Sequence, residues 1–199
     1  KKVPQYGFWE PNKLQHSLPL NTESLKKSKL VFIIFYRSFI MANDLNPIRK
    51  LYYSFKKNNI TSVGIFLPSL KEPKSAKWVQ DQISNLSPSC IVNATAFSAK
   101  NKNGVSPLDI GNVPTFQIAL STNDKKSWEK EDRGLSPTNM AMHVALPEID
   151  GRIFAGVASF KKKMPTDFKL QFNEIKHETY KDGISSITQK LNTYQLTQK

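Results

Sequence analysis

Short apolar runs alternate with stretches of helical periodicity along most of this sequence. Residues 30–36 are apolar or aromatic throughout, so both faces of the segment suit burial, as in a central strand of a parallel sheet. Four later runs also predict strands, at residues 62–67, 90–94, 114–120 and 153–160. An alternating pattern at Phe168, Leu170 and Phe172 predicts one more strand near the C-terminus.

Helices are predicted between these runs. Asn46 followed by Pro47 is typical of a helix start, and Ser136 followed by Pro137 repeats that pattern. Ser75 is predicted to cap a further helix. Residues 147–151 predict a turn after the helix that begins at Ser136. The apolar positions expected to face the core are Ile48, Leu51, Tyr52, Phe55, Val79, Ile83, Leu86, Ile184, Ile187, Leu191 and Tyr194.

The order of these elements predicts an α/β fold with a doubly wound, mainly parallel sheet flanked by helices. Residues 29–160 are expected to form the sheet domain. Residues 1–28 predict an irregular aromatic and proline-rich arm, because Pro4, Pro11 and Pro19 interrupt regular structure. Residues 161–199 are expected to add a small C-terminal strand and helix.

Composition narrows the class of protein. The net charge is +13, but only four of the 29 basic residues are arginine, and the lysines are scattered as pairs and one triplet. No stripe of lysines alternates with aromatics, which disfavours nucleic-acid binding. Cys90 is the single cysteine, and no apolar run has membrane-spanning length, so we expect a cytoplasmic protein without a membrane span. Because the first residue is lysine, we expect a fragment of a longer protein.

Common nucleotide, hydrolase and metal motifs are missing from the sequence. It contains no G-x-G-x-x-G, no Walker A loop and no G-x-S-x-G. The three histidines, His16, His143 and His177, lie far apart in sequence and form no ligand pair at short spacing. Neither a bound cofactor nor a metal site is predicted for this chain.

Three polar sets remain as candidates for a site. They are Arg37 with Ser38, Asn93 with Thr95, and a set at the predicted turn that holds Glu148, Asp150 and Arg152. If the strands that precede the first two sets are neighbours, both sets reach one crevice at the carboxyl edge of the sheet. Arg37 would then bind a carboxylate or carboxamide with Asn93 beside it.

A purely structural alternative exists for two of these sets. Arg37 would pair with Glu148 or Asp150 and brace the edge of the sheet, because such ion pairs are common at loop edges. Asp150 and Arg152 would likewise form only a tight turn with an ion pair.

Several segments, taken in order, resemble the large subunit of cobaltochelatase (CobN type) and, more distantly, the magnesium chelatase H subunit. The resemblance covers roughly residues 6–195. It rests on residues 35–38 (Phe-Tyr-Arg-Ser), 69–73 (Ser-Leu-Lys-Glu-Pro), 93–97 (Asn-Ala-Thr-Ala-Phe), 107–109 (Pro-Leu-Asp), 133–136 (Arg-Gly-Leu-Ser), 144–153 (Val-Ala-Leu-Pro-Glu-Ile-Asp-Gly-Arg-Ile) and 159–161 (Ser-Phe-Lys).

This resemblance implies a part of the subunit that binds the tetrapyrrole during cobalt insertion into the corrin hydrogenobyrinic acid a,c-diamide, in cobalamin biosynthesis. The implied partners are the remaining domains of the large subunit, the AAA+ subunits that use ATP and magnesium, and the corrin, with cobalt as substrate. The family's Thr-His-Gly block is absent here, so no catalytic residue is carried over and the chain alone is expected to be inactive. Arg37, Ser38, Asn93, Thr95, Glu148 and Asp150 remain as substrate-facing candidates.

Two other functions stay open. One is a magnesium chelatase H-type domain that binds protoporphyrin, and the other is a non-enzymatic scaffold or small-ligand domain of the same fold.

Overall fold

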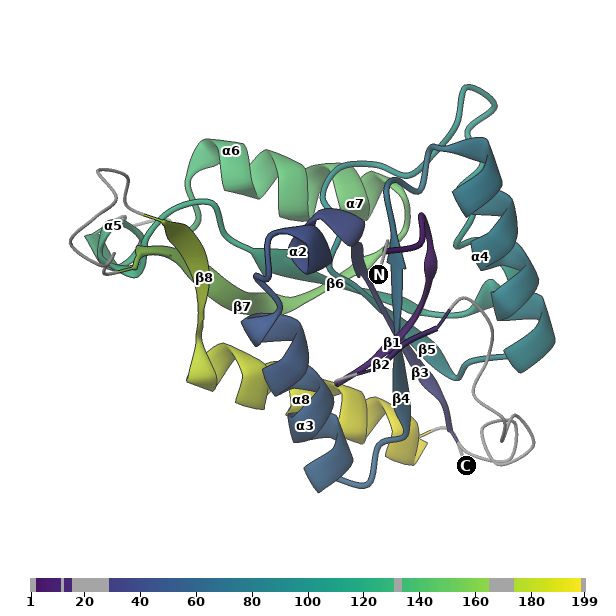
Figure 1. Cartoon of the computed structure of the whole chain (residues 1–199), viewed down its shortest axis with the longest axis horizontal. Helices are drawn as coiled ribbons and strands as arrows, with labels where there is room; N and C mark the ends of the chain where they lie inside the picture. Colours follow the sequence, from purple (N-terminus) through teal and green to yellow (C-terminus); the bar gives the residue numbers. More distant parts are fainter. Residues whose placement is uncertain (1–2, 12, 16–28, 131–133, 165–173, 198–199) are drawn as a thin grey trace.

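The computed structural model describes residues 3–11, 13–15, 29–130, 134–164 and 174–197, whose strands form one sheet in the order β2-β1-β4-β3-β5-β6-β7-β8 (Figure 1). The strands are β1 (Gly7–Glu10), β2 (Lys13–Gln15), β3 (Val31–Tyr36), β4 (Ser62–Leu67), β5 (Cys90–Asn93), β6 (Thr115–Leu120), β7 (Ile153–Lys163) and β8 (Ile175–Thr179). The longer helices are α3 (Asn46–Lys57), α4 (Pro73–Leu86) and α8 (Lys181–Thr197). Shorter helical segments are α2 (Arg37–Met41), α5 (Lys125–Lys130), α6 (Pro137–Met140), a π-helical segment (Ala141–Ala145), α7 (Leu146–Ile149) and a 3-10 turn (Ile110–Asn112).

The centre of the sheet is parallel, and β3 lies between β4 and β5. β6 pairs with β5, and β7 pairs with β6, also in parallel. All five apolar runs that predict these central strands are therefore confirmed, as is the α/β class. Because the first of these strands has the second and third on its two sides, the chain reverses its direction of winding between β3 and β5.

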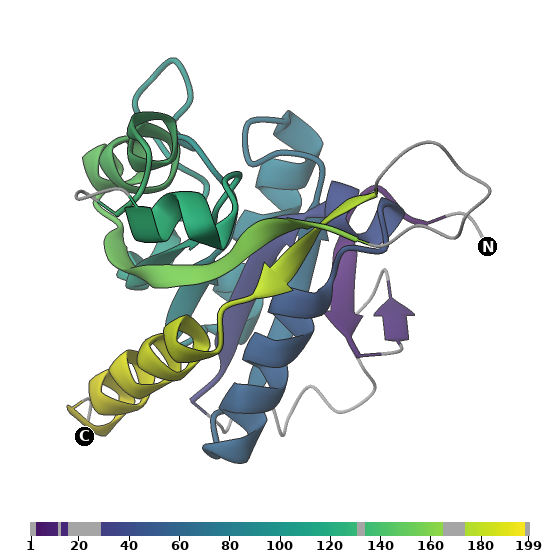
Figure 2. The same ribbon diagram turned by 90° about the vertical axis from the view of Figure 1, so that its left-hand side faces the viewer.

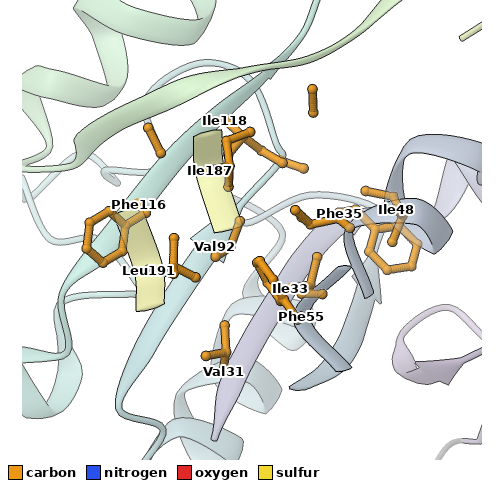
Figure 3. Close-up of a cluster of buried hydrophobic side chains, with 14 of the residues drawn as sticks. Val31, Ile33, Phe35, Ile48, Phe55, Val92, Phe116, Ile118, Ile187 and Leu191 are labelled. Atoms are coloured by element: carbon orange, nitrogen blue, oxygen red, sulfur yellow. The ribbon is translucent and has the colours of Figure 1, made fainter. Parts of the chain in front are cut away.

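One face of the sheet is covered by α3 and α8, which contact each other (Figures 1 and 2). Ile33 and Phe35 of β3 point to this face and share its core with Phe55 of α3 (Figure 3). Ile187 of α8 lies in the same core beside Val92 of β5 and Ile118 of β6. The opposite face carries α4, whose Val79 and Ile83 pack on Phe32 and Ile34. Apolar residues thus alternate along β3 between two cores, which is why every position of the run is apolar.

The N-terminal segment is more regular than the sequence predicts. We expected residues 1–28 to be irregular, and this is wrong for β1, which pairs antiparallel with β4, and for β2, which pairs with β1. Pro4 and Pro11 flank β1 instead of interrupting it. Trp9 is buried beside Gly64 of β4, where an added Cβ would lie 2.8 Å from the Trp9 ring. Glycine at position 64 therefore makes room for the indole.

Helix starts agree with the sequence in part. The prediction that Asn46 caps a helix is wrong, because α3 already includes Asn46 and the preceding residue, Leu45, holds the cap position. Ser136 caps α6 and accepts a hydrogen bond from the Asn139 amide, as predicted. The predicted cap at Ser75 is wrong, because α4 begins at Pro73 and Glu72 accepts hydrogen bonds from the amides of Lys74 and Ser75.

The helix after Ser136 continues through Pro147 to Ile149, so the predicted turn is shorter than residues 147–151. The π-helical segment ends two residues before Pro147, and the Leu146 amide donates to the carbonyl of Ala141, five residues back. Proline has no N–H and its ring crowds the carbonyl four residues earlier, which accounts for the wider turn.

The C-terminal elements belong to the same sheet and core. β8 pairs antiparallel with β7, and α8 packs on β7 where Gly183 approaches the Val157 carbonyl. An added Cβ at position 183 would lie 1.9 Å from that oxygen, so only glycine permits the approach. The strand predicted at Phe168, Leu170 and Phe172 lies outside the described residues. In the described ranges, no helix has the length and hydropathy needed to cross a membrane.

Candidate functional site

A small pocket lies at the carboxyl ends of β3 and β5, where the winding direction reverses. Its volume is about 160 Å³, and Tyr36, residues 69–71 and residues 95–99 line it. Tyr36 ends β3, residues 69–71 follow β4, and Thr95 follows β5. Open α/β sheets bind ligands at this reversal point, because the loops after the two strands separate there and leave a crevice.

Two aromatic residues shape the pocket. The Tyr36 hydroxyl donates a hydrogen bond to the Ala96 carbonyl at 3.0 Å, and burial raises the pKa of that hydroxyl. Phe97 has a φ of 66°, a left-handed conformation that costs a non-glycine residue free energy. Its amide donates to the Met142 carbonyl at 2.8 Å, which fixes the conformation, and the side chain stays 48% exposed at the pocket mouth.

A buried polar network lies beneath the loop that follows β5. The Asn93 side-chain nitrogen donates to Gln117 Oε1 at 2.8 Å, and Asn93 Oδ1 accepts from the Thr95 hydroxyl at 2.9 Å. Gln117 Nε2 donates to the Thr95 carbonyl at 2.7 Å. Arg152 Nη1 donates to Gln117 Oε1 at 3.2 Å and so connects β5 and β6 with the start of β7. The network leaves Thr95 in one fixed position at the pocket floor.

Asp150 connects the same network to the loop that follows β5. Its carboxylate pairs with Arg152 Nη2 at 2.9 Å and accepts hydrogen bonds from the Ser98 hydroxyl and the Ala99 amide, each at 2.6 Å. Burial lowers the pKa of Arg152, and the negative charge of Asp150 opposes that shift. Ser98 and Ala99 line the pocket, so the ion pair positions one of its walls.

The structure separates the six predicted site residues. Asn93, Thr95 and Asp150 are buried in one hydrogen-bonded network, while Ser38 and Glu148 are exposed. Arg37 is half-buried, and its Nε and Nη2 atoms donate to the carbonyls of Pro4 and Val3 at 2.7 and 2.9 Å.

Arg37 and Asn93 therefore follow neighbouring strands as predicted, but their side chains have different partners and do not form a common rim. The expected pairing of Arg37 with Glu148 or Asp150 is not the contact seen either, because Asp150 pairs with Arg152. A tight turn with an ion pair is the alternative that the geometry matches at residues 150–152, where Gly151 has a φ of 76°.

Sequence reasoning missed several residues of this region. Gln117 is a polar residue inside an otherwise apolar strand, a pattern that signals a buried hydrogen-bonding role. Lys71 follows a proline-terminated strand and lines the pocket, but nothing in the sequence distinguishes it from the many other lysines.

The two described histidines, His143 and His177, are both buried and lie close enough for their charges to interact. Both ring nitrogens of His143 lack a hydrogen-bond partner among the described residues, and burial lowers its pKa to about 4. His177 Nδ1 lies 2.9 Å from the Ser159 hydroxyl, and burial together with the Lys161 charge lowers its pKa to about 4. No group of three His, Cys, Asp or Glu side chains in the described part of the chain is arranged to hold a metal ion.

Comparison with known proteins assigns the family. Residues 1–198 match the model of the CobN/Magnesium Chelatase family, so the chain belongs to that family. The aerobic cobaltochelatase subunit CobN of Sinorhizobium sp is 31% identical over 151 residues, which are 74% of this chain and 12% of that protein. The CobN subunit of Pseudomonas aeruginosa is 32% identical over 133 residues, 66% of this chain and 11% of that protein.

A solved structure shares the fold. The catalytic subunit of cobaltochelatase from Mycobacterium tuberculosis superimposes with a TM-score of 0.67 at 18% sequence identity, covering 93% of this chain and 15% of that one. The chain thus spans only a small part of the length of the relatives it matches.

Proposed function

We propose that this chain is a tetrapyrrole-contacting part of the large subunit of an ATP-dependent cobaltochelatase, acting in the cytoplasm in cobalamin biosynthesis. The observation that carries the proposal is a convergence in space. Three segments that resemble the CobN-type subunit in sequence, at residues 35–38, 69–73 and 93–97, meet at the pocket between β3 and β5.

The pocket matches one side group of a corrin and not the whole ring. A volume of about 160 Å³ is well below the several hundred Å³ typical of sites that enclose a complete ligand. Corrin precursors carry carboxylates and amides around an apolar macrocycle. The Lys71 ammonium would bind a carboxylate, and the Thr95 hydroxyl oxygen, whose proton is donated to Asn93, would accept from an amide N–H. The exposed ring of Phe97 would contact the macrocycle.

The six predicted site residues differ in whether they touch the ligand in this proposal. Thr95 contacts the ligand, and Asn93 and Asp150 hold the pocket wall in position. Ser38 and Glu148 are exposed, and Arg37 anchors the N-terminal segment. Metal insertion would be carried out elsewhere in the large subunit with AAA+ partners that hydrolyse ATP, and cobalt would be the substrate.

Titration of the full-length protein with hydrogenobyrinic acid a,c-diamide and, separately, protoporphyrin tests the proposal. The corrin is expected to bind more tightly, and Lys71→Gln is expected to weaken it several-fold. Lys77→Gln, which removes an equal charge from an exposed position on α4, is the matched control. Tighter binding of protoporphyrin would favour the magnesium chelatase H-type alternative. Absence of binding by either tetrapyrrole would favour a scaffold role.

A further inference from the structure

A second and larger concave surface lies between α5 and the paired strands β7 and β8. This groove has a volume of about 830 Å³. It is separate from the Tyr36 pocket and shares none of its lining residues. Its lining holds the lysines at residues 125–126 and 161–163, three acidic residues and Ile175.

Folding gathers lysines that are far apart in the sequence. The pair at residues 125–126 and the triplet at residues 161–163 both line the groove. The Lys161 amide donates to the Asn123 carbonyl at 2.9 Å, so the segment after β6 continues beside the end of β7. Lysines that are scattered in the sequence are therefore clustered on this surface of the folded chain.

Two of the three acidic residues of the groove are paired with lysines, and the third, Asp124, is hydrogen-bonded but keeps its negative charge. Asp124 accepts hydrogen bonds from the amide and hydroxyl of Ser127. Glu129 pairs with Lys125, and Glu178 pairs with Lys162.

Two lysines of the groove have no acidic partner, against one carboxylate, Asp124, that has no cationic partner, so a small positive excess remains. Lys161 reaches Asp44, outside the groove, whereas Lys126 and Lys163 take part in no ion pair among the described residues. The exposed pairs that remain are weak and exchange readily for a bound anion.

The lining indicates which kind of anion fits. None of the described lining residues is aromatic or arginine, so the groove offers neither stacking faces for bases nor guanidinium forks for phosphates. It offers separate ammonium groups on flexible stems, whose methylene groups supply apolar contact, and the side chain of Ile175, which is 54% exposed. A volume of about 830 Å³ lies within the range of small-molecule sites.

We propose that this groove binds a small polycarboxylate, a ligand with several separated carboxylates around an apolar body. Lys126 and Lys163 contact the carboxylates, and Ile175 with the lysine stems contacts the apolar body. This inference concerns a surface apart from the corrin pocket and does not depend on the proposed function.

Calorimetric titration of the full-length protein with mellitate, a benzene ring that carries a carboxylate at every carbon, tests the site. Trimesate and benzoate provide the same ring with successively fewer carboxylates. We expect affinity to fall along that series and with added salt. The double variant Lys126→Gln/Lys163→Gln should bind mellitate roughly tenfold or more weakly. The matched control Lys57→Gln/Lys77→Gln removes the same charge from exposed positions on α3 and α4.

The outcomes separate the alternatives. An equal loss of mellitate affinity in both double variants would overturn the proposal. It would show that affinity depends on the net charge of the protein and not on the lysines of the groove. Tighter binding of an oligoglutamate peptide or of single-stranded oligonucleotide than of mellitate would overturn it in favour of a macromolecular partner. Unchanged circular dichroism in both variants verifies that the fold is intact.

Discussion

Arg152 and Asp150 form a buried ion pair, with Nη2 of Arg152 2.9 Å from Oδ2 of Asp150. Only 2% of the Arg152 side chain and none of the Asp150 side chain is exposed. The pair links the turn before β7 to the loop after β5, because the same carboxylate accepts from Ser98 and Ala99. The wall of the candidate pocket therefore depends on residues that need not touch a ligand.

Replacing Arg152 with leucine is expected to destabilise the fold by about 3–5 kcal/mol. The variant leaves the Asp150 carboxylate buried without its cation and removes a donor from Gln117. The free energy of unfolding, measured by urea denaturation, gives the effect. Arg152→Leu combined with Asp150→Asn should recover part of the loss, since the uncompensated charge is then removed.

The exposed pair of Lys77 and Asp81 serves as the comparison for that experiment. Lys77→Leu should change stability little, because exposed pairs are screened by solvent. Equal effects of Arg152→Leu and Lys77→Leu would contradict a structural role for the buried pair.

Asn93 and Gln117 are expected to be energetically coupled. Asn93→Ala or Gln117→Leu alone should cost about 1–3 kcal/mol, because each leaves buried polar groups without a partner. In the double variant the two costs should not add, and a coupling of about 0.5–3 kcal/mol is expected from the cycle. Strictly additive costs in urea denaturation would show that the two side chains act independently.

Stability should decline in mild acid because of the buried histidines. The folded-state pKa values of His143 and His177 are lowered to about 4 from 6.5, so the unfolded chain binds more protons between those values. Stability is therefore fully present above pH 6.5 and is lost as pH falls toward 4. Around His177, Lys161 and His143 add to this shift and Asp44 opposes it.

His143→Leu should reduce the slope of stability against pH between pH 5 and 6.5, since an unpartnered imidazole is replaced by an apolar side chain. Thermal denaturation of the parent chain and of the variant, at several pH values between 5 and 6.5, measures this slope. His16→Leu would serve as a comparison at a histidine outside the described residues. A slope that His143→Leu leaves unchanged would show that His143 does not titrate on unfolding.

Arg37→Lys is expected to loosen the N-terminal segment. Lysine cannot reproduce the two donors that Arg37 directs to the carbonyls of Val3 and Pro4. Hydrogen exchange of the amides in β1 should become faster than in the parent chain, while β6 amides stay protected. Arg49→Lys, at a half-buried position on α3 whose guanidinium donates an exposed hydrogen bond to Asn46, should leave both regions unchanged.

The central strands could be predicted because each apolar run is a local pattern, and their alternation with helices predicted the doubly wound class. The adjacency of β3 and β5 entered only as a condition, because strand order depends on tertiary structure. The run at residues 30–36 needed no knowledge of its neighbours to be identified as buried on two sides. β1 was missed because Trp9 is accommodated by Gly64, a contact between segments far apart in the chain. Burial of that indole outweighed the local effect of the prolines.

The site was predicted less well, for a related reason. The ends of β3, β4 and β6 agree with the prediction, whereas β5 ends one residue earlier and β7 three residues later. Asn93, Thr95 and Asp150 do meet in one network. The partner of each polar side chain depends on tertiary structure, so no local pattern indicates that Arg37 reaches the carbonyls of Val3 and Pro4 instead of a crevice. The gathering of lysines around the groove depends on strand pairing in the same way.

Titration of the full-length protein and its Phe97→Gly variant with hydrogenobyrinic acid a,c-diamide tests the central claim most directly. Glycine relieves the left-handed conformation at position 97, so stability should change by no more than about 1 kcal/mol. The exposed ring is lost, and corrin affinity should fall about tenfold. A variant that keeps both its stability and its full corrin affinity would contradict the claim that this edge of the sheet contacts the tetrapyrrole.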